Sequence, residues 1–306
     1  MLKIIFKKTI NMTNLKSHGL LILFLLFTYN VMAQESKLVK AITRGNLSKT
    51  EKEINKGANL NELTASGKPP LMIATELGEE EIVKLLVNNG SDIDLKDKSG
   101  HTALLIAAYN GELKILKYLS DNGANILHVS NNNRNATELA ILGLEDTFIK
   151  TRIYPAENNE NIANFEEVAI YLLDNDIVPS HFETMKIVCK YCSSELVKKM
   201  IEKGAVTDNG SNNTLLHTVA EATLLTFAKA DQLALNEPMA NLVMEHSKRK
   251  IPTEQEIEDI ENNYVEIIQI LVNAGINPNM KNDKGKTAFD IASSLKIAEA
   301  LKELME

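Results

Sequence analysis

Aromatic residues are scarce in this sequence, and tryptophan is missing from it. Phe, Trp and Tyr together make up 5% of the 306 residues, while hydrophobic residues of all kinds reach 44% and charged residues 24%. These proportions exclude a disordered or fibrous chain and are ordinary for a globular one. A core with so few rings has to be built from Leu, Ile, Val and Ala, which is typical of proteins made of repeated units.

Acidic residues outnumber basic residues, and the two kinds are unevenly distributed. The formal net charge is −8, and the first 33 residues contain four lysines and no acid. The rest of the chain therefore carries 29 basic residues against 41 acidic residues, a charge of −12. An acidic surface repels phosphate groups, which argues against nucleic acid as a partner. The same surface attracts a basic protein partner.

The N-terminus resembles an export signal. A lysine-rich segment precedes an apolar run from Leu20 to Phe27, and Val31-Met32-Ala33 fits a cleavage site before Gln34. A membrane anchor is the alternative, but Asn30 interrupts the apolar stretch, and about 18 apolar residues are needed to cross a bilayer. We therefore expect residues 1–33 to be a cleaved signal peptide. Residues 34–306 would then be exported, to the periplasm or outside the cell, with no stable membrane span.

Both cysteines belong to one Cys-x-x-Cys sequence, Cys189 and Cys192. In an exported protein they could form a disulfide, although it would close a very small loop and add little stability. A thioredoxin-like redox motif would need a βαβ context, which the surrounding sequence lacks. We interpret the two residues as small side chains in tight places, with redox chemistry as the alternative.

Four sets of residues in the first half of the chain recur with a spacing of 33. A fixed period of about 20 to 50 residues indicates a stack of supersecondary units, each too small to bury its own apolar face. Such a protein works through its surface and not through a pocket. The four sets are Leu38, Leu71 and Leu104; Ala41, Ala74 and Ala107; Gly45, Gly78 and Gly111; and Gly57, Gly90 and Gly123.

The pattern is clearest from Gly100 to Ile126. Gly100-His101-Thr102-Ala103-Leu104-Leu105-Ile106-Ala107-Ala108-Tyr109-Asn110-Gly111 resembles the ankyrin signature G-x-T-P-L-H-x-A-A-x-x-G, and a second helical segment closes with Gly123-Ala124-Asn125. Thr102 suits a helix N-cap and Gly111 suits the left-handed residue that ends a helix. Leu104 and Ala107 share one helix face.

The register slips after Gly123, and the slips can be counted. The next units close after 53, 28 and 71 residues instead of 33, at Asp176, Gly204 and Gly275. These spacings predict an insertion at about residues 144–163, a shortening of five residues, and a second insertion at about residues 221–262. Insertions in repeat proteins map to loops on one face, which often binds a partner.

The ankyrin resemblance implies an all-α solenoid of about seven helix-turn-helix repeats with β-like turns and the two insertions. It also implies a concave surface, made of turn tips and first-helix ends, that binds a protein. Tyr109 is the expected anchor, because Tyr is favoured at interface hot spots. Carried over by position, the partner-binding residues are Lys68, Glu76, Leu77, Lys96, Lys98, His101, Tyr109, Asn110, Asn131, Asn132, Arg134 and Leu142.

Motifs for catalysis, metal binding or phosphate binding find no support in the sequence. His217 and Glu221 have the spacing of a ligand pair, but His217 occupies the ankyrin histidine position, where the resemblance implies a structural hydrogen bond. Gly285-Lys286-Thr287 lacks the glycine that a phosphate loop needs five residues earlier. We expect no enzyme activity, no metal, no cofactor and no small-molecule substrate.

The sequence therefore favours an exported, non-catalytic protein-protein interaction module, which could neutralise a basic partner. Two alternatives remain at this point. The first is a structural scaffold of the cell envelope that uses the insertions as contacts. The second is a thiol redox protein that uses Cys189 and Cys192.

Overall fold

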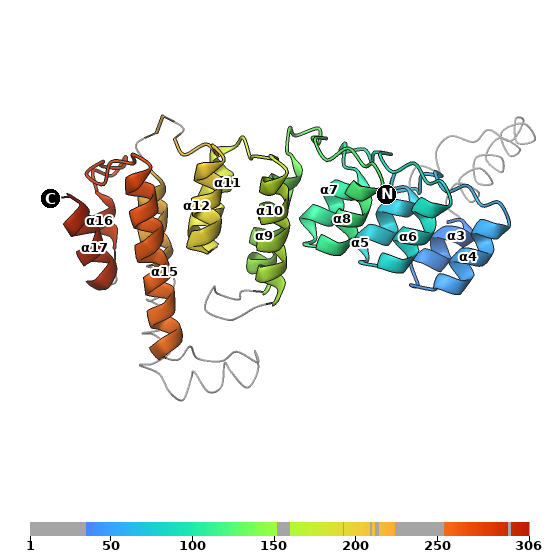
Figure 1. Cartoon of the computed structure of the whole chain (residues 1–306), viewed down its shortest axis with the longest axis horizontal. Coiled ribbons are helices and arrows are strands. Elements are labelled where there is room, and N and C mark those ends of the chain that lie inside the picture. Colours follow the sequence, from blue (N-terminus) through green and yellow to red (C-terminus); the bar gives the residue numbers. More distant parts are fainter. Residues whose placement is uncertain are drawn as a thin grey trace, which may run out of the picture. The chain divides into compact units, whose positions relative to one another are not determined.

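The fold is that of a computed structural model, which describes residues 35–151, 160–191, 193–208, 210–211, 214–223, 254–292 and 295–305. This part of the chain is all-α, as the sequence predicts, and contains no strand (Figure 1). It divides into two compact units, the first ending at Lys98 and the second beginning at Ser99. The predicted signal peptide, residues 1–33, lies outside the described residues.

The first unit consists of two helical hairpins. They are formed by α3 (Lys37–Ile42) with α4 (Leu47–Asn55), and by α5 (Pro70–Glu76) with α6 (Glu80–Asn88). The apolar residues that recur with the 33-residue period are buried in these hairpins, including Leu38 and Leu71. A proline is tolerated at the first position of α5 because the first amides of a helix have no internal partner.

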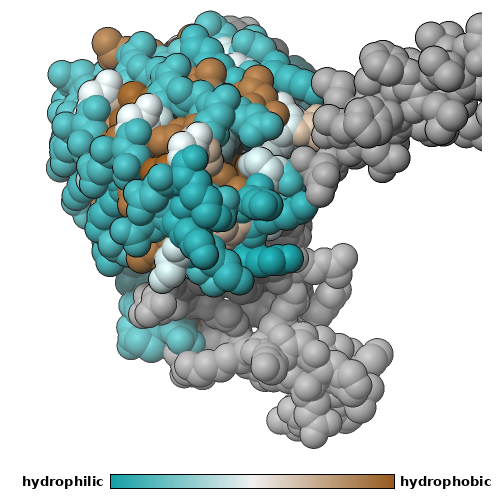
Figure 2. All heavy atoms as spheres, turned by 90° about the vertical axis from the view of Figure 1, so that its right-hand side faces the viewer, coloured by the Kyte–Doolittle hydropathy of each residue, from teal (hydrophilic) through white to brown (hydrophobic). Residues whose placement is uncertain are grey.

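The outer helix of the first hairpin is polar, as a terminal repeat requires. Among the residues of α4 only Thr50 is buried, and Leu47 at its start is 42% exposed. Figure 2 looks at the right-hand side of the view in Figure 1 and shows mainly hydrophilic residues, with smaller hydrophobic areas between them. A polar outer face keeps the end of a repeat stack compatible with water.

The second unit continues the same arrangement with longer and less regular hairpins (Figure 1). Residues 215–223 are also helical and precede α15. The other helices, in chain order, are α7 (Ala103–Tyr109), α8 (Leu113–Asp121), α9 (Ala136–Thr151), α10 (Glu160–Asp174), α11 (Phe182–Tyr191), α12 (Ser194–Glu202), α15 (Glu254–Asn273), α16 (Ala288–Ile291) and α17 (Leu295–Met305).

The local signals predicted from the sequence are present where the repeats are regular. The side chain of Thr102 caps α7 by accepting the amide of Leu105. Gly111 has a φ of 72°, in the left-handed region that ends a first helix. Asp176, which replaces the closing glycine of the fourth repeat, keeps the same left-handed geometry with a φ of 61°. Asp and Asn tolerate this region better than other residues with a Cβ atom.

Part of each predicted insertion is an extension of a helix. α9 has 16 residues and α10 has 15, against 7 in α7 and 9 in α8. α15 has 20 residues, against 9 in α12. The remaining parts of the insertions, residues 152–159 and 224–253, lie outside the described residues. Both ends of each insertion are therefore helical and continue the hairpins from which they arise.

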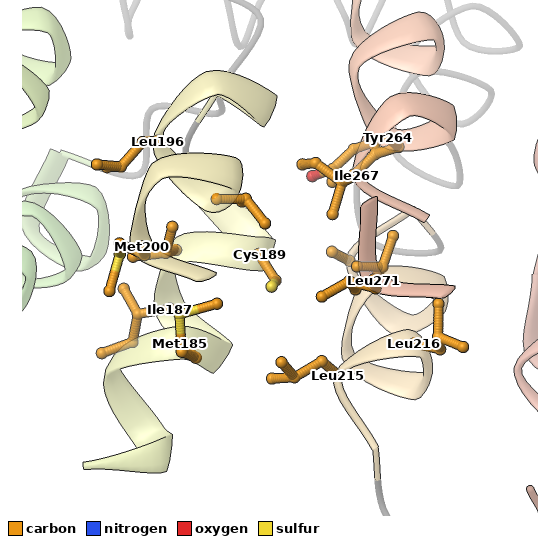
Figure 3. Packing of buried hydrophobic residues seen from close by; sticks show 14 of the residues in the cluster. Met185, Ile187, Cys189, Leu196, Met200, Leu215, Leu216, Tyr264, Ile267 and Leu271 are labelled. Carbon is orange, nitrogen blue, oxygen red and sulfur yellow. The ribbon is translucent and has the colours of Figure 1, made fainter. Parts of the chain in front are cut away.

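Leu, Ile, Val and Met side chains between successive hairpins form the core of the second unit (Figure 3). Leu196 and Met200 on α12 and Ile267 and Leu271 on α15 are fully buried. Removing an aliphatic side chain of this size from water contributes about 2 kcal/mol. Tyr264 anchors the long helix α15, because its hydroxyl donates a hydrogen bond of 2.9 Å to the carbonyl of Lys190.

The turn that joins each repeat to the next is called a finger here. The first three fingers are residues 58–69, 91–102 and 124–135. The fourth repeat is followed instead by a short link, residues 177–181, which runs directly from Asp176 into α11. The shortening of the fifth repeat therefore lies in this connection, which has five residues instead of the twelve of a finger, while the two helices of the repeat remain and α11 is longer than α7.

Candidate functional site

In the first unit, the structure brings three of the predicted binding residues together. Lys68 precedes α5 and Glu76 ends it, and Nζ of Lys68 lies 2.6 and 2.7 Å from the two carboxylate oxygens of Glu76. The stem of Lys98 crosses Gly67, where an added Cβ atom would lie 2.9 Å from Cε of the lysine. Leu77 follows α5 and is 48% exposed.

The electrostatics of this cluster are those of a solvated surface. A pair of exposed charges such as Lys68 and Glu76 contributes about 0 to 1 kcal/mol, so it positions the side chains more than it stabilises the fold. Lys96 is exposed on the second finger. The first unit therefore presents a charged face at the start and the end of α5, with Leu77 beside it.

In the second unit, the predicted residues fall on equivalent positions of two adjacent first helices. His101 and Tyr109 flank α7, and Arg134 and Leu142 stand 33 residues later, at α9. α7 and α9 pack against each other. All four residues are partly exposed, and their equal spacing places them at equivalent positions of the two repeats.

Tyr109 is held in place by Asp146, which has no counterpart in the repeat pattern. Its hydroxyl donates a hydrogen bond of 2.5 Å to Oδ2 of Asp146, on the extension of α9. Burial, and then the hydrogen bond to Asp146, raise the pKa of Tyr109 to about 12. The expected anchor is therefore fixed in place by the first insertion, which has no counterpart in the repeat pattern.

Gly143 makes this contact feasible. A Cβ atom on this residue would overlap the carbonyl oxygen of Tyr109 and lie 2.9 Å from Cε1 of Phe165. Gly143 lies inside α9 and has no positive φ, so close helix packing explains the glycine and backbone geometry does not. The interruption of an apolar helix by a lone glycine was the signal available in the sequence.

The third finger carries Asn131, Asn132 and Arg134 of the predicted residues. Asn131 covers Gly100, and its amide donates a hydrogen bond of 3.0 Å to the carbonyl of Ser99 in the second finger. Asn132 is exposed. Arg134 is partly buried, and its Nη1 has no hydrogen-bond partner among the described residues. Asn110 ends α7 as its C-cap.

Similarity to known proteins supports the repeat interpretation. The model of the family of ankyrin repeats (3 copies) matches residues 29–147. The crystal structure of the human ASB11 ankyrin repeat domain matches with a TM-score of 0.56 and 22% identity, and it covers 88% of this chain and 98% of that one. The crystal structure of the ankyrin repeat domain of Bcl-3 matches with a TM-score of 0.53 and 17% identity, over the same shares of the two chains.

The described chain has the ankyrin repeat fold, and residues 29–147 match the ankyrin family model. At these identities the two solved structures establish the fold alone. No curated protein matches the chain. In the part of the ankyrin repeat domain that the structure describes, each helix is too short or too polar to span a bilayer.

The position of the ankyrin histidine, three residues after the helix-capping residue, holds different side chains in different repeats. His217 accepts hydrogen bonds from Thr214 at Nδ1, and its Nε2 lies 3.0 Å from the carbonyl of Lys286. Asp290 has the same register and accepts the amide and hydroxyl of Thr287. His217 is thus a structural residue, as the resemblance implies, and Glu221 does not share its hydrogen bonds.

Glu138 occupies this position in the fourth repeat and has a further set of donors. Its side chain is fully buried, and Oε1 accepts the amides of Ser180 and His181 at 2.8 and 3.0 Å. Oε2 accepts the amide of Asn135. Together with the hydrogen bond from Thr137 to the carbonyl of Ile177, these contacts fasten the short link onto α9.

The proximity of Ser180, His181 and Glu138 does not form a catalytic triad. The serine hydroxyl and the carboxylate both contact Nδ1 of His181, at 3.2 and 2.6 Å. A relay needs the base to bond the nucleophile through one ring nitrogen and the carboxylate through the other. Across the described residues no group of three or more His, Cys, Asp or Glu side chains could hold a metal ion.

Cys189 is a free thiol in the core of the second unit (Figure 3). It is fully buried, and burial raises its pKa to about 12. A reactive cysteine requires an accessible thiolate at neutral pH, which this environment disfavours. Cys192 lies outside the described residues, so the disulfide that the sequence left open between it and Cys189 is not tested.

Proposed function

We propose that this ankyrin repeat domain is an exported, non-catalytic module that binds a protein partner through its concave surface. The observation that carries the proposal is the alignment of partly exposed side chains on adjacent first helices, His101 and Tyr109 at α7 and Arg134 and Leu142 at α9. Ankyrin repeats typically serve in protein-protein interaction. A surface that presents basic, aromatic and aliphatic side chains on adjacent repeats suits a protein better than a small molecule.

Charge supports a partner of opposite sign. The net charge of −8 raises the rate at which a basic protein approaches and lowers the rate for an acidic one. Export is supported by the lysine-rich start, the apolar run and the small residues before Gln34.

A capture experiment with two charge-balanced variants tests the binding surface. The variant His101→Glu with Leu142→Lys alters the proposed surface, and Lys114→Glu with Asp121→Lys makes an equivalent change on the exposed side of α8. The immobilised chain is incubated with proteins from its native compartment, which are then identified by mass spectrometry. The proposal predicts a protein retained by the natural chain and the α8 variant and lost with the first variant.

Equal retention by both variants would place binding elsewhere and contradict the proposed surface. The export proposal has its own measurement, because the full chain can be produced in a Gram-negative cell and its fractions compared. N-terminal sequencing should find Gln34 as the first residue of the exported form. A full-length chain confined to the cytoplasm would refute export without affecting the binding surface.

A further inference from the structure

The missing finger leaves the third finger without a neighbour on one side. Twelve residues form each of the first three fingers, whereas residues 177–181 form the link that follows the fourth repeat. Glu138 and Thr137 hold this link against α9 through the hydrogen bonds described above. The link contacts the third finger at its last residue, where Nδ2 of Asn135 donates a hydrogen bond of 2.7 Å to the carbonyl of Val178. Its five residues are too few to pair with the rest of that finger, residues 124–134.

Leu127 has the register of a residue that contacts the next finger. In the first finger this position is Asn61, whose Oδ1 accepts the amide of Asp92 in the second finger at 2.9 Å. The third finger has an apolar side chain at the same position, where no finger follows. Leu127 is 72% exposed and Val129 is 40% exposed. An exposed pair of apolar side chains at a finger edge is stabilised when a partner covers it and removes it from water.

The backbone of the third finger also has an unused acceptor on this side. Successive fingers are joined where the amide of Asn131 donates to the carbonyl of Ser99. Asn132 stands 33 residues after Ser99 in the repeat, and its carbonyl receives no hydrogen bond from the described residues. An extended segment placed in the gap can donate its own amide to this carbonyl, as an added strand does at a sheet edge.

The charge of this region differs from that of the whole chain. Residues 124–137 contain no Asp or Glu, in a sequence with 41 acidic residues. Nη1 of Arg134 is buried and has no hydrogen-bond partner among the described residues, so an acceptor brought against this side chain would satisfy an unused donor. The nearby acids are occupied, since Glu138 is buried in its own network and Asp176 pairs with Lys203 at 2.6 Å.

We propose that the gap beside the third finger, lined by Leu127, Val129 and Arg134, is a docking site for an extended segment of a protein partner. The segment has an apolar residue next to an aspartate or glutamate. This inference rests on the proposed protein-binding function and names one contact within it. Even if the partner is basic overall, the segment bound here would be apolar and acidic. Lysines in that segment would be repelled by the positive charge of Arg134.

A random dodecapeptide library displayed on phage provides the probe. Peptides are selected on the full chain, and the strongest is synthesised with a fluorescent label for anisotropy measurements. Leu127→Asn restores the residue type of the first finger, and Arg134→Met removes the cation at similar volume. Leu63→Asn is the matched control, since Leu63 is 51% exposed on a finger that has a following neighbour.

The proposal predicts selected peptides in which an apolar residue adjoins Asp or Glu. Their affinity should fall about tenfold with Leu127→Asn or Arg134→Met and change less than about twofold with Leu63→Asn. Circular dichroism should show all variants folded, because the three positions are not in the core. Failure to enrich any peptide, a lysine-rich consensus, or unchanged affinity with Leu127→Asn would overturn it.

Sedimentation velocity separates a second copy of this chain from a different partner. Self-association that disappears with Leu127→Asn would make the chain its own occupant and would also overturn the proposal. These outcomes leave the capture experiment on His101 and Leu142 unaffected, so failure of the docking site can be told apart from failure of the proposed function.

Discussion

Oε1 of Glu138 lies 2.6 Å from Nδ1 of His181, 43 residues later in the chain, and joins α9 to the link that replaces a finger. The carboxylate is fully buried, while the imidazole is 34% exposed. A buried carboxylate is stable only when donors replace the water that it loses, and here three backbone amides and the histidine supply them. This arrangement shows how the stack tolerates the loss of a finger.

Replacing Glu138 by Ala should therefore destabilise the second unit. The change leaves the amides of Ser180 and His181 without an acceptor, at a cost of about 3 kcal/mol. Urea unfolding followed by circular dichroism measures the loss. Glu183→Ala is the control, since it removes an exposed pair with Lys186 and should cost less than about 1 kcal/mol. Equal effects of the two changes would show that the Glu138 network adds no stability.

The contribution of Glu138 should depend on pH in a defined direction. Burial raises the pKa of this carboxyl, but hydrogen bonds from His181, Asn135 and Ser180 outweigh burial and lower the pKa below its ordinary value of 4.5. A group whose pKa is lower in the folded state stabilises above the unfolded value and loses that stabilisation as the pH falls through the folded value.

Glu138→Gln keeps the size of the side chain and removes its ionisation. The stability difference between the natural chain and this variant should be largest near neutral pH and should shrink below about pH 4.5. Urea midpoints at a series of pH values provide the comparison. A difference that grows on acidification would contradict the sign of the pKa shift.

Gly143→Ala tests the close approach of α9 to α7. The added methyl group would overlap the carbonyl of Tyr109, and a clash with backbone cannot be relieved by turning a flexible side chain. We expect a loss of about 3 kcal/mol or more in the free energy of unfolding. Gly123→Ala is the control, since its added Cβ meets nothing within 4 Å and costs only the strain of a φ of 93°, about 1 to 2 kcal/mol.

Tyr109 should be among the last tyrosines to ionise. The sequence has seven tyrosines, and a titration followed by absorbance near 295 nm should include one group with a pKa of about 12. That group should disappear with Tyr109→Phe, which removes the hydroxyl bonded to Asp146. Because the folded pKa exceeds the unfolded value of 10, stability from this contact is lost as the pH rises from 10 to 12. An unchanged titration curve would show that the hydroxyl is solvated.

The repeat pattern predicted the regular part of the fold because each repeated residue begins, ends or packs a helix through interactions with residues close to it in sequence. Gly111 and Thr102 end and begin helices through backbone geometry and one hydrogen bond, which neighbouring residues specify. The contacts of Tyr109 and Glu138 were not predictable in this way. Asp146 belongs to an insertion with no counterpart in other repeats, and His181 contacts Glu138 only because a finger is missing.

The extra residues of α9, α10 and α15 lengthen helices within the hairpins, so the neighbouring repeats keep their stacking. A foreign sequence inserted between the end of α9 at Thr151 and the start of α10 at Glu160 is therefore expected to leave the repeats in register. A reporter protein inserted at this point would be carried as part of the folded domain, and the stacking of the repeats would be kept.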